Sequence, residues 1–147
     1  MEAQPTGPYV QAALFCETVL QEPNHVLSII RVIDQVTIKV VGAEAPEALP
    51  RFGYSMQALI MLKPGSARGR HTYMLSMERP NGLKNEVGTG TANFTGGQNQ
   101  GASIRLNLNL TFDQEGLYWF DLILDGKLLT RMPFQVLYEL IKPGTTQ

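Results

Sequence analysis

Strict alternation of apolar and polar residues over residues 104–112 is the clearest pattern in the chain. The even-numbered positions carry isoleucine, leucine and phenylalanine, and the odd-numbered positions carry arginine, asparagine and threonine. A period of two buries one set of side chains and exposes the other, as in antiparallel sheets, whereas a helix would distribute the leucines around its circumference. Residues 52–63 alternate in the same way. Both segments are therefore predicted to be strands.

Proline, glycine and asparagine divide the remaining sequence into runs rich in β-branched and aromatic residues, which is typical of consecutive strands. Residues 9–20 are apolar on both faces and fit a strand or a helix. Residues 26–41 are rich in valine and isoleucine, which favour strands. We expect one long strand there, or two strands divided near Asp34, and a further strand over residues 71–79.

The stretch Gly88–Gly101 contains five glycines, and Phe94 is its one large apolar residue. This composition is flexible and offers few packing contacts, so we expect a mobile loop or a poorly ordered strand. Residues 42–50 contain two prolines and are expected to form a loop, with room for one helical turn.

The last hairpin joins residues 116–123 to residues 127–138 through Leu124-Asp125-Gly126. A two-residue turn at Asp125-Gly126 would place Phe120 on the same face as Arg131. A three-residue turn, with Gly126 in a left-handed bulge, gathers an almost wholly apolar face instead. That face consists of Tyr118, Phe120, Leu122, Leu128, Thr130, Met132 and Phe134. We therefore predict the three-residue turn.

About seven to eight strands without a long helical pattern predict an all-β fold, an antiparallel two-sheet sandwich. A β-barrel is the alternative, since it produces the same alternation. The 147 residues fit a single domain with its own core. Residues 1–8 and 143–147 are expected to be flexible ends.

Charge and hydropathy remove several classes of partner. The chain carries 12 basic and 13 acidic residues, a net charge of −1, without basic blocks, so we expect no nucleic acid partner. Its apolar runs are far shorter than the roughly 18–20 residues of a membrane span, and no polybasic amphipathic segment is present. No signal peptide is recognised and Cys16 is the one cysteine, so a cytoplasmic protein is expected.

Few residues of the chain bear catalytic chemistry. His25, His71 and Cys16 are too few and too scattered for a metal site, and we expect no metal and no cofactor. Both histidines are interpreted as solvated residues at segment ends, and Cys16, which lies in an apolar run, as a core residue. No nucleophile motif is present, so an enzyme is not expected. A hydrolase assembled around His71 is the weakest hypothesis.

The second face of the last hairpin carries the candidate binding residues, Trp119, Arg131, Asp121, Ile123 and Leu129. In the predicted register Trp119 lies directly opposite Arg131, with Asp121 diagonal to it. Tryptophan and arginine are the residues most enriched at binding hot spots. We therefore expect a non-catalytic protein-interaction or assembly module that holds a protein partner or a second copy of itself.

Two other interpretations of these segments stay open. Residues 13–15 or the glycine-rich stretch would cover the Trp119 face if that face is structural. Alternatively, the chain is a small-molecule or glycan-binding domain. Residues 88–101 would then form a lid over the polar Asn107 and Asn109 face, and Tyr73 or Phe94 would serve as the sugar-stacking aromatic.

Two resemblances to known families accompany these patterns. The segments Glu115-Gly-Leu-Tyr-Trp-Phe120, Asp125-Gly126 and Pro133-Phe-Gln-Val136 are similar to the closing hairpin of immunoglobulin-like sandwich domains such as filamin repeats. This resemblance implies the fold and no activity. The segments Leu14-Phe-Cys-Glu-Thr-Val19 and Val26-Leu-Ser-Ile-Ile-Arg-Val-Ile-Asp34 resemble a bacterial family of small β-rich domains without an assigned function. This second resemblance implies a bacterial intracellular protein and supplies no catalytic residues.

Overall fold

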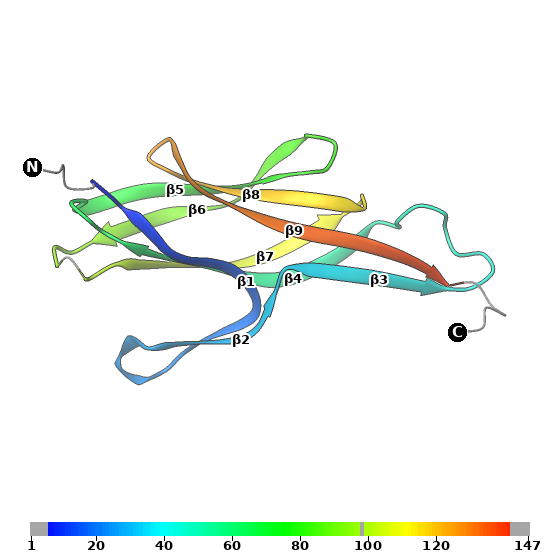
Figure 1. Cartoon of the computed structure of the whole chain (residues 1–147), viewed down its shortest axis with the longest axis horizontal. Helices are drawn as coiled ribbons and strands as arrows, with labels where there is room; N and C mark the ends of the chain where they lie inside the picture. The colour runs from blue at the N-terminus through cyan, green and yellow to red at the C-terminus, as the bar shows by residue number, and fades with distance from the viewer. Residues whose placement is uncertain (1–5, 98, 142–147) are drawn as a thin grey trace, which may run out of the picture.

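Strands form nearly all of the regular structure in the computed structural model, which describes residues 6–97 and 99–141 (Figure 1). Within that part, nine strands form a four-stranded sheet of order β2-β1-β4-β7 and a five-stranded sheet of order β3-β9-β8-β5-β6. The predicted all-β, two-sheet sandwich is confirmed, with nine strands in place of seven to eight. The strands are β1 (Tyr9–Gln21), β2 (Leu27–Ile33), β3 (Gln35–Val41), β4 (Phe52–Lys63), β5 (Gly69–Glu78), β6 (Lys84–Phe94), β7 (Ala102–Phe112), β8 (Gly116–Leu124) and β9 (Lys127–Ile141).

The valine- and isoleucine-rich segment forms two strands that belong to different sheets. The division falls at Asp34, as predicted, so β2 pairs with β1 and β3 pairs with β9. The β3–β9 pair is parallel, with Gln35 opposite Gln135 and Val41 opposite Ile141. The prediction of an antiparallel sandwich is therefore wrong for this pair. Alternation of side chains reports which face is buried and contains no information on strand direction.

Aromatic side chains from both sheets meet in the core. The ring of Phe15 on β1 lies 4.8 Å from that of Phe120 on β8 and 5.6 Å from that of Phe134 on β9, both edge-to-face. Phe112 on β7 stacks on Phe134 at 5.8 Å and meets Tyr118 edge-on at 4.7 Å. Such pairs add about 0.5–1.5 kcal/mol each to the free energy of area burial, so they help to fix how the sheets face each other.

Glycines at residues 88 and 90 make room for side chains of neighbouring strands. A Cβ on Gly88 would lie 2.9 Å from Cδ1 of Leu106, and a Cβ on Gly90 would lie 2.5 Å from the Tyr73 hydroxyl. Residues 88–94 are therefore part of strand β6, and the prediction of a mobile loop or poorly ordered strand over 88–101 is wrong for them. Glycine composition indicates flexibility in a free chain, whereas here it permits close packing.

The last hairpin closes with a two-residue loop, Asp125-Gly126, whose φ angles of 49° and 82° are the left-handed values that such loops require. The predicted three-residue turn is therefore wrong. Ile123 pairs with Leu128, but the next residue, Leu122, pairs with Thr130. Leu129 is therefore the extra residue of a β-bulge in β9. Because of this bulge, most residues of the predicted apolar face still lie together on the buried side of the hairpin. Leu128 is the exception, because 57% of its surface is exposed.

The ends that were predicted to be flexible are described only in part. Residues 1–5 and 143–147 lie outside the described residues. The carbonyl of Thr6 accepts hydrogen bonds from the backbone N–H and the hydroxyl of Ser66, at 3.1 and 2.6 Å. Residue 6 is therefore held against the β4–β5 loop.

Substitution of Gly90 by alanine is expected to destabilise the fold by about 1–3 kcal/mol, because the new methyl group would overlap the buried ring of Tyr73. Gly53→Ala on β4 is the matched control, since its Cβ would lie 3.8 Å from the nearest atom, the Leu110 carbonyl oxygen. Urea unfolding of both variants measures the difference. Equal stabilities would show that Gly90 is not a packing position.

Candidate functional site

Three of the five predicted binding residues meet on the outer face of the five-stranded sheet. Arg131 on β9 lies opposite Asp121 on β8 and donates a hydrogen bond from Nε to its Oδ1 at 2.7 Å. Its guanidinium carbon lies 4.6 Å from the centroid of the Trp119 ring. The expected direct pairing of Trp119 with Arg131 is wrong, because Trp119 lies opposite Pro133 and meets Arg131 on the diagonal.

The other two predicted residues are separated by the bulge. Ile123 pairs with Leu128 and is partly buried. Leu129 packs against the main core cluster and so is not available on the outer face. The sequence missed this division because a bulge in a hairpin leaves no mark on the alternation beyond it.

The charges on this face are paired with one another. Arg131 also lies 3.8 Å from Glu78, which in turn lies 3.4 Å from Lys84. The hydrogen bond that Arg131 donates to Asp121 raises the pKa of the guanidinium above its ordinary value, so Arg131 stays charged. Asp121 is only 8% exposed. These pairings indicate that Arg131 stabilises the sheet by compensating a buried carboxylate, and they leave less of its charge for a partner.

A two-stranded arm is the most unusual feature of the surface. β1 pairs with β4 only as far as Cys16, and from there to Gln21 it pairs only with β2. Residues 17–33 therefore form a ribbon, which Figure 1 shows extending away from the two sheets. We call this ribbon the arm.

Apolar side chains on the arm remain exposed to solvent. Ten large hydrophobic residues are exposed in the described part of the chain, and half of them lie on the arm. They are Leu20 (44%), Val26 (55%), Ile29 (38%), Ile30 (43%) and Val32 (63%). Single exposed hydrophobic residues are ordinary, whereas contiguous apolar patches are typical of interaction surfaces. The sequence predicts the strand here but not this exposure, because alternation cannot show that a strand lacks a covering layer.

A crevice at the base of the arm connects it to the predicted face. It has a volume of about 240 Å³ and lies between residues 13–15 and 32–34 on one side and residues 130–133 on the other. Val32 and Arg131 both line it. Residues 13–15, proposed as an alternative cover for the Trp119 face, thus reach the edge of that face, where they leave an open crevice.

His71 is paired with a carboxylate that lies far away in the sequence. Its Nδ1 is hydrogen-bonded to Oδ2 of Asp125, and its Nε2 lies 3.1 Å from the carbonyl oxygen of Arg68. The side chain is 20% exposed, so its interpretation as a solvated end residue is wrong. Both ring nitrogens therefore face oxygen atoms of neighbouring groups. Asp125 lies in the β8–β9 turn, which places its carboxylate next to His71 at the start of β5.

The polar face proposed for sugar binding lacks its aromatic residue. Gln57 donates to Asn107 at 2.6 Å, and Ser55 donates to Asn109 at 2.8 Å. The proposed stacking residues Tyr73 and Phe94 are 8% and 2% exposed and belong to the core. Residues 88–94 form part of β6, so they are not a lid. The structure therefore does not bring the parts of this predicted site together.

Across residues 6–97 and 99–141, no three histidine, cysteine, aspartate or glutamate side chains converge as a metal site would require. The same residues contain no helix that is long and apolar enough to cross a membrane. Cys16 is fully buried in a small second cluster with Val19 and Leu59, and burial raises the pKa of its thiol.

The fold and its surfaces define a β-sandwich domain with an apolar two-stranded arm. Residues 11–137 match the family described as "Family of unknown function (DUF6941)", and the chain belongs to this family. The expected membership in a family of β-rich domains without an assigned function is thereby confirmed. No curated protein matches the chain.

Solved structures with a similar fold include a β-glucosidase from Listeria innocua, in complex with glucose, in complex with isofagomine and alone. The TM-scores are 0.52, 0.50 and 0.52, each at 7% sequence identity. Each alignment covers 90% of this chain and 17% of the β-glucosidase chain. At this identity the likeness concerns the fold alone.

Replacement of Arg131 by methionine is expected to lower the free energy of unfolding, because it leaves the buried carboxylate of Asp121 without its main partner. Lys127→Met in the same strand is the control, since Lys127 makes no ion pair within the described residues. Chemical unfolding of the two variants gives the comparison. If R131M is as stable as the wild type, Arg131 is not a structural residue.

Asp125→Asn is expected to lower the melting temperature at neutral pH. Hydrogen bonds from the Thr72 N–H and from His71 lower the pKa of the Asp125 carboxyl below its ordinary value of 3.8. The carboxylate therefore stabilises the fold fully above pH 3.8, and this contribution is lost as the pH falls through the lower, folded-state pKa.

Asparagine keeps the positive φ that residue 125 adopts, so D125N tests the charge and not the turn. Melting curves from neutral pH to acid should show a smaller acid-induced loss of stability for D125N than for the wild type. Glu44→Gln, in the exposed loop after β3, is the control. Parallel curves for D125N and the wild type would contradict this account.

Proposed function

We propose that the chain is a non-catalytic protein-interaction module that binds an apolar surface of a partner protein through its arm. The observation that carries this proposal is the gathering of five exposed hydrophobic side chains on one projecting ribbon. A two-stranded ribbon alone is marginally stable in water, and a partner that covers these side chains would stabilise it.

Comparison of the edge strands supports the arm as the binding element. The other edges expose mainly polar or charged residues, such as Lys84 and Glu86 on β6 and Thr37 and Lys39 on β3. Charged residues protect sheet edges against unwanted association. On β2 the one charged residue is Arg31, which lies 3.1 Å from Glu17 and is thereby neutralised.

The conformation of Arg31 favours packing of side chains over addition of a strand. Its φ of 57° interrupts the extended backbone in the middle of β2. A regular edge is the template on which another strand pairs, and such irregularities oppose that pairing. We infer that the partner contacts Ile30 and Val32, and that the adjoining crevice with Arg131 receives part of its surface.

Two observations support the absence of catalysis. Both nitrogens of His71 are engaged, by Asp125 and by the carbonyl of Arg68, so neither is placed to accept a proton from a nucleophile. The thiol of Cys16 is buried and its pKa is raised, which opposes thiolate formation.

The double variant Ile30→Lys/Val32→Lys is expected to abolish association while it changes the free energy of unfolding by no more than about 0.5 kcal/mol, since both side chains are exposed. Self-association is measured by sedimentation velocity over a range of concentrations. Association with another protein is measured by placing a photo-cross-linking amino acid at residue 29 in the producing cell, followed by binding of the purified partner.

Leu83→Lys is the matched control, because Leu83 is 64% exposed and lies in the β5–β6 turn away from the arm. The proposal predicts that this variant associates as the wild type does. It fails if the arm variant and the control bind equally well, or if the wild type is monomeric and residue 29 forms no cross-link.

A further inference from the structure

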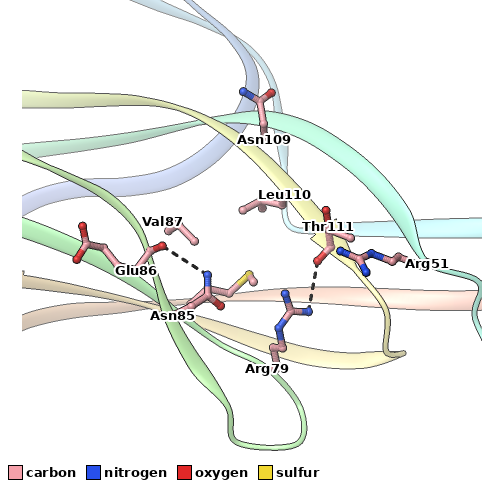
Figure 2. A pocket seen from close by; sticks show the side chains of 9 residues that line it. Arg51, Arg79, Asn85, Glu86, Val87, Asn109, Leu110 and Thr111 are labelled. Carbon is pink, nitrogen blue, oxygen red and sulfur yellow. Dashed lines mark hydrogen bonds between the residues drawn. The ribbon is translucent and has the colours of Figure 1, made fainter.

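A wedge-shaped pocket lies where the free edges of β6 and β7 diverge. Gly88 on β6 and Leu106 on β7 are close enough that a Cβ on the glycine would touch the leucine, so the strands meet at this level. Beyond it, residues 85–87 and residues 109–111 line a pocket of about 380 Å³ (Figure 2). No residue of the arm lines this pocket.

Two arginines lie at the pocket with unused hydrogen-bond donors. Arg79, just after β5, donates from Nη1 to the Thr111 carbonyl oxygen at 3.3 Å and to Oδ1 of Asp113 at 2.8 Å. These bonds fix its guanidinium and leave Nε and Nη2 without partners among the described residues. Arg51, just before β4, makes no hydrogen bond or ion pair within that part of the chain.

The remaining polar residues of the lining offer further hydrogen-bond donors but only one carboxylate. The side-chain amide of Asn85 makes one long hydrogen bond of 3.5 Å to the Glu86 carbonyl. Glu86 is the one acid of the lining, and Figure 2 shows its carboxylate directed away from both arginines. Met77, Val87 and Leu110 border the pocket from below, but they are buried or partly buried, so the exposed lining is almost wholly polar.

We propose that this pocket binds a carboxylate, such as that of a glutamate side chain of a peptide. A guanidinium presents paired N–H donors that match the two oxygens of a carboxylate. The charges of Arg51 and Arg79 are opposed by Glu86 in the lining and by Asp113, which pairs with Arg79, and so weak a positive charge fits a monoanion better than a phosphate dianion. The site is separate from the arm and goes beyond the proposed function.

The probe is N-acetyl-glutamic acid α-amide, with the corresponding glutamine compound as its neutral counterpart. Titrations followed by ¹H–¹⁵N NMR should show saturable shifts at Asn85, Thr111 and Arg79 for the glutamate compound and none for the glutamine compound. Arg51→Gln should weaken binding by about tenfold, the loss expected for one charged hydrogen-bonding group.

Arg105→Gln is the matched control, since Arg105 is also exposed and belongs to β7 but does not line the pocket. It should bind as the wild type does. Arg79→Lys, which keeps the charge but not the paired donors, should also bind more weakly. Equal binding by R51Q and R105Q would overturn the proposal, and so would equal binding of the glutamine compound or tighter binding of inorganic phosphate.

Discussion

Edge-to-face packing of Phe15 between Phe120 and Phe134 is the contact on which the rest of this structure depends. Phe15 pairs with both β4 and β2, one residue before the pairing of β1 with β4 ends at Cys16. The same ring therefore holds the two sheets together and fixes the base of the arm. Because a buried aromatic ring contributes several kcal/mol at most positions, the projecting ribbon starts from a rigid point even though its far end has few contacts.

The sandwich is closed on one side and open on the other. The segment 27–41 crosses between the sheets at Asp34 and so joins them covalently beside β9. On the opposite side β6 and β7 touch near Gly88 and then diverge. Arg79 donates to the carbonyl of Thr111 at the free edge of β7, which satisfies a group that would otherwise need water or another strand.

Alternation in the sequence was sufficient to predict strands β4 and β7, most of their core residues, and the all-β class. It was insufficient where the backbone departs from a regular ladder. The bulge next to Ile123 changed the partner of Arg131, and the close approach of Tyr73 to Gly90 converted an expected loop into a strand. The exposure of Ile30 and the pairing of His71 with Asp125 depend on which segments meet in space, and spacing along the chain does not report that.

The charged and apolar parts of the surface have different roles because of how their groups are paired. On the outer face of the five-stranded sheet, Arg131 is balanced by Asp121 and Glu78, so opening that cluster to a partner would cost the stability it provides. On the arm, Val32 is exposed without any such compensation, and covering it loses nothing. Burial of apolar surface contributes roughly 25 cal/mol per Å², so binding energy is more readily obtained on the arm than on the Trp119 face. The crevice that both Val32 and Arg131 line is where a partner seated on the arm would first meet the charged cluster.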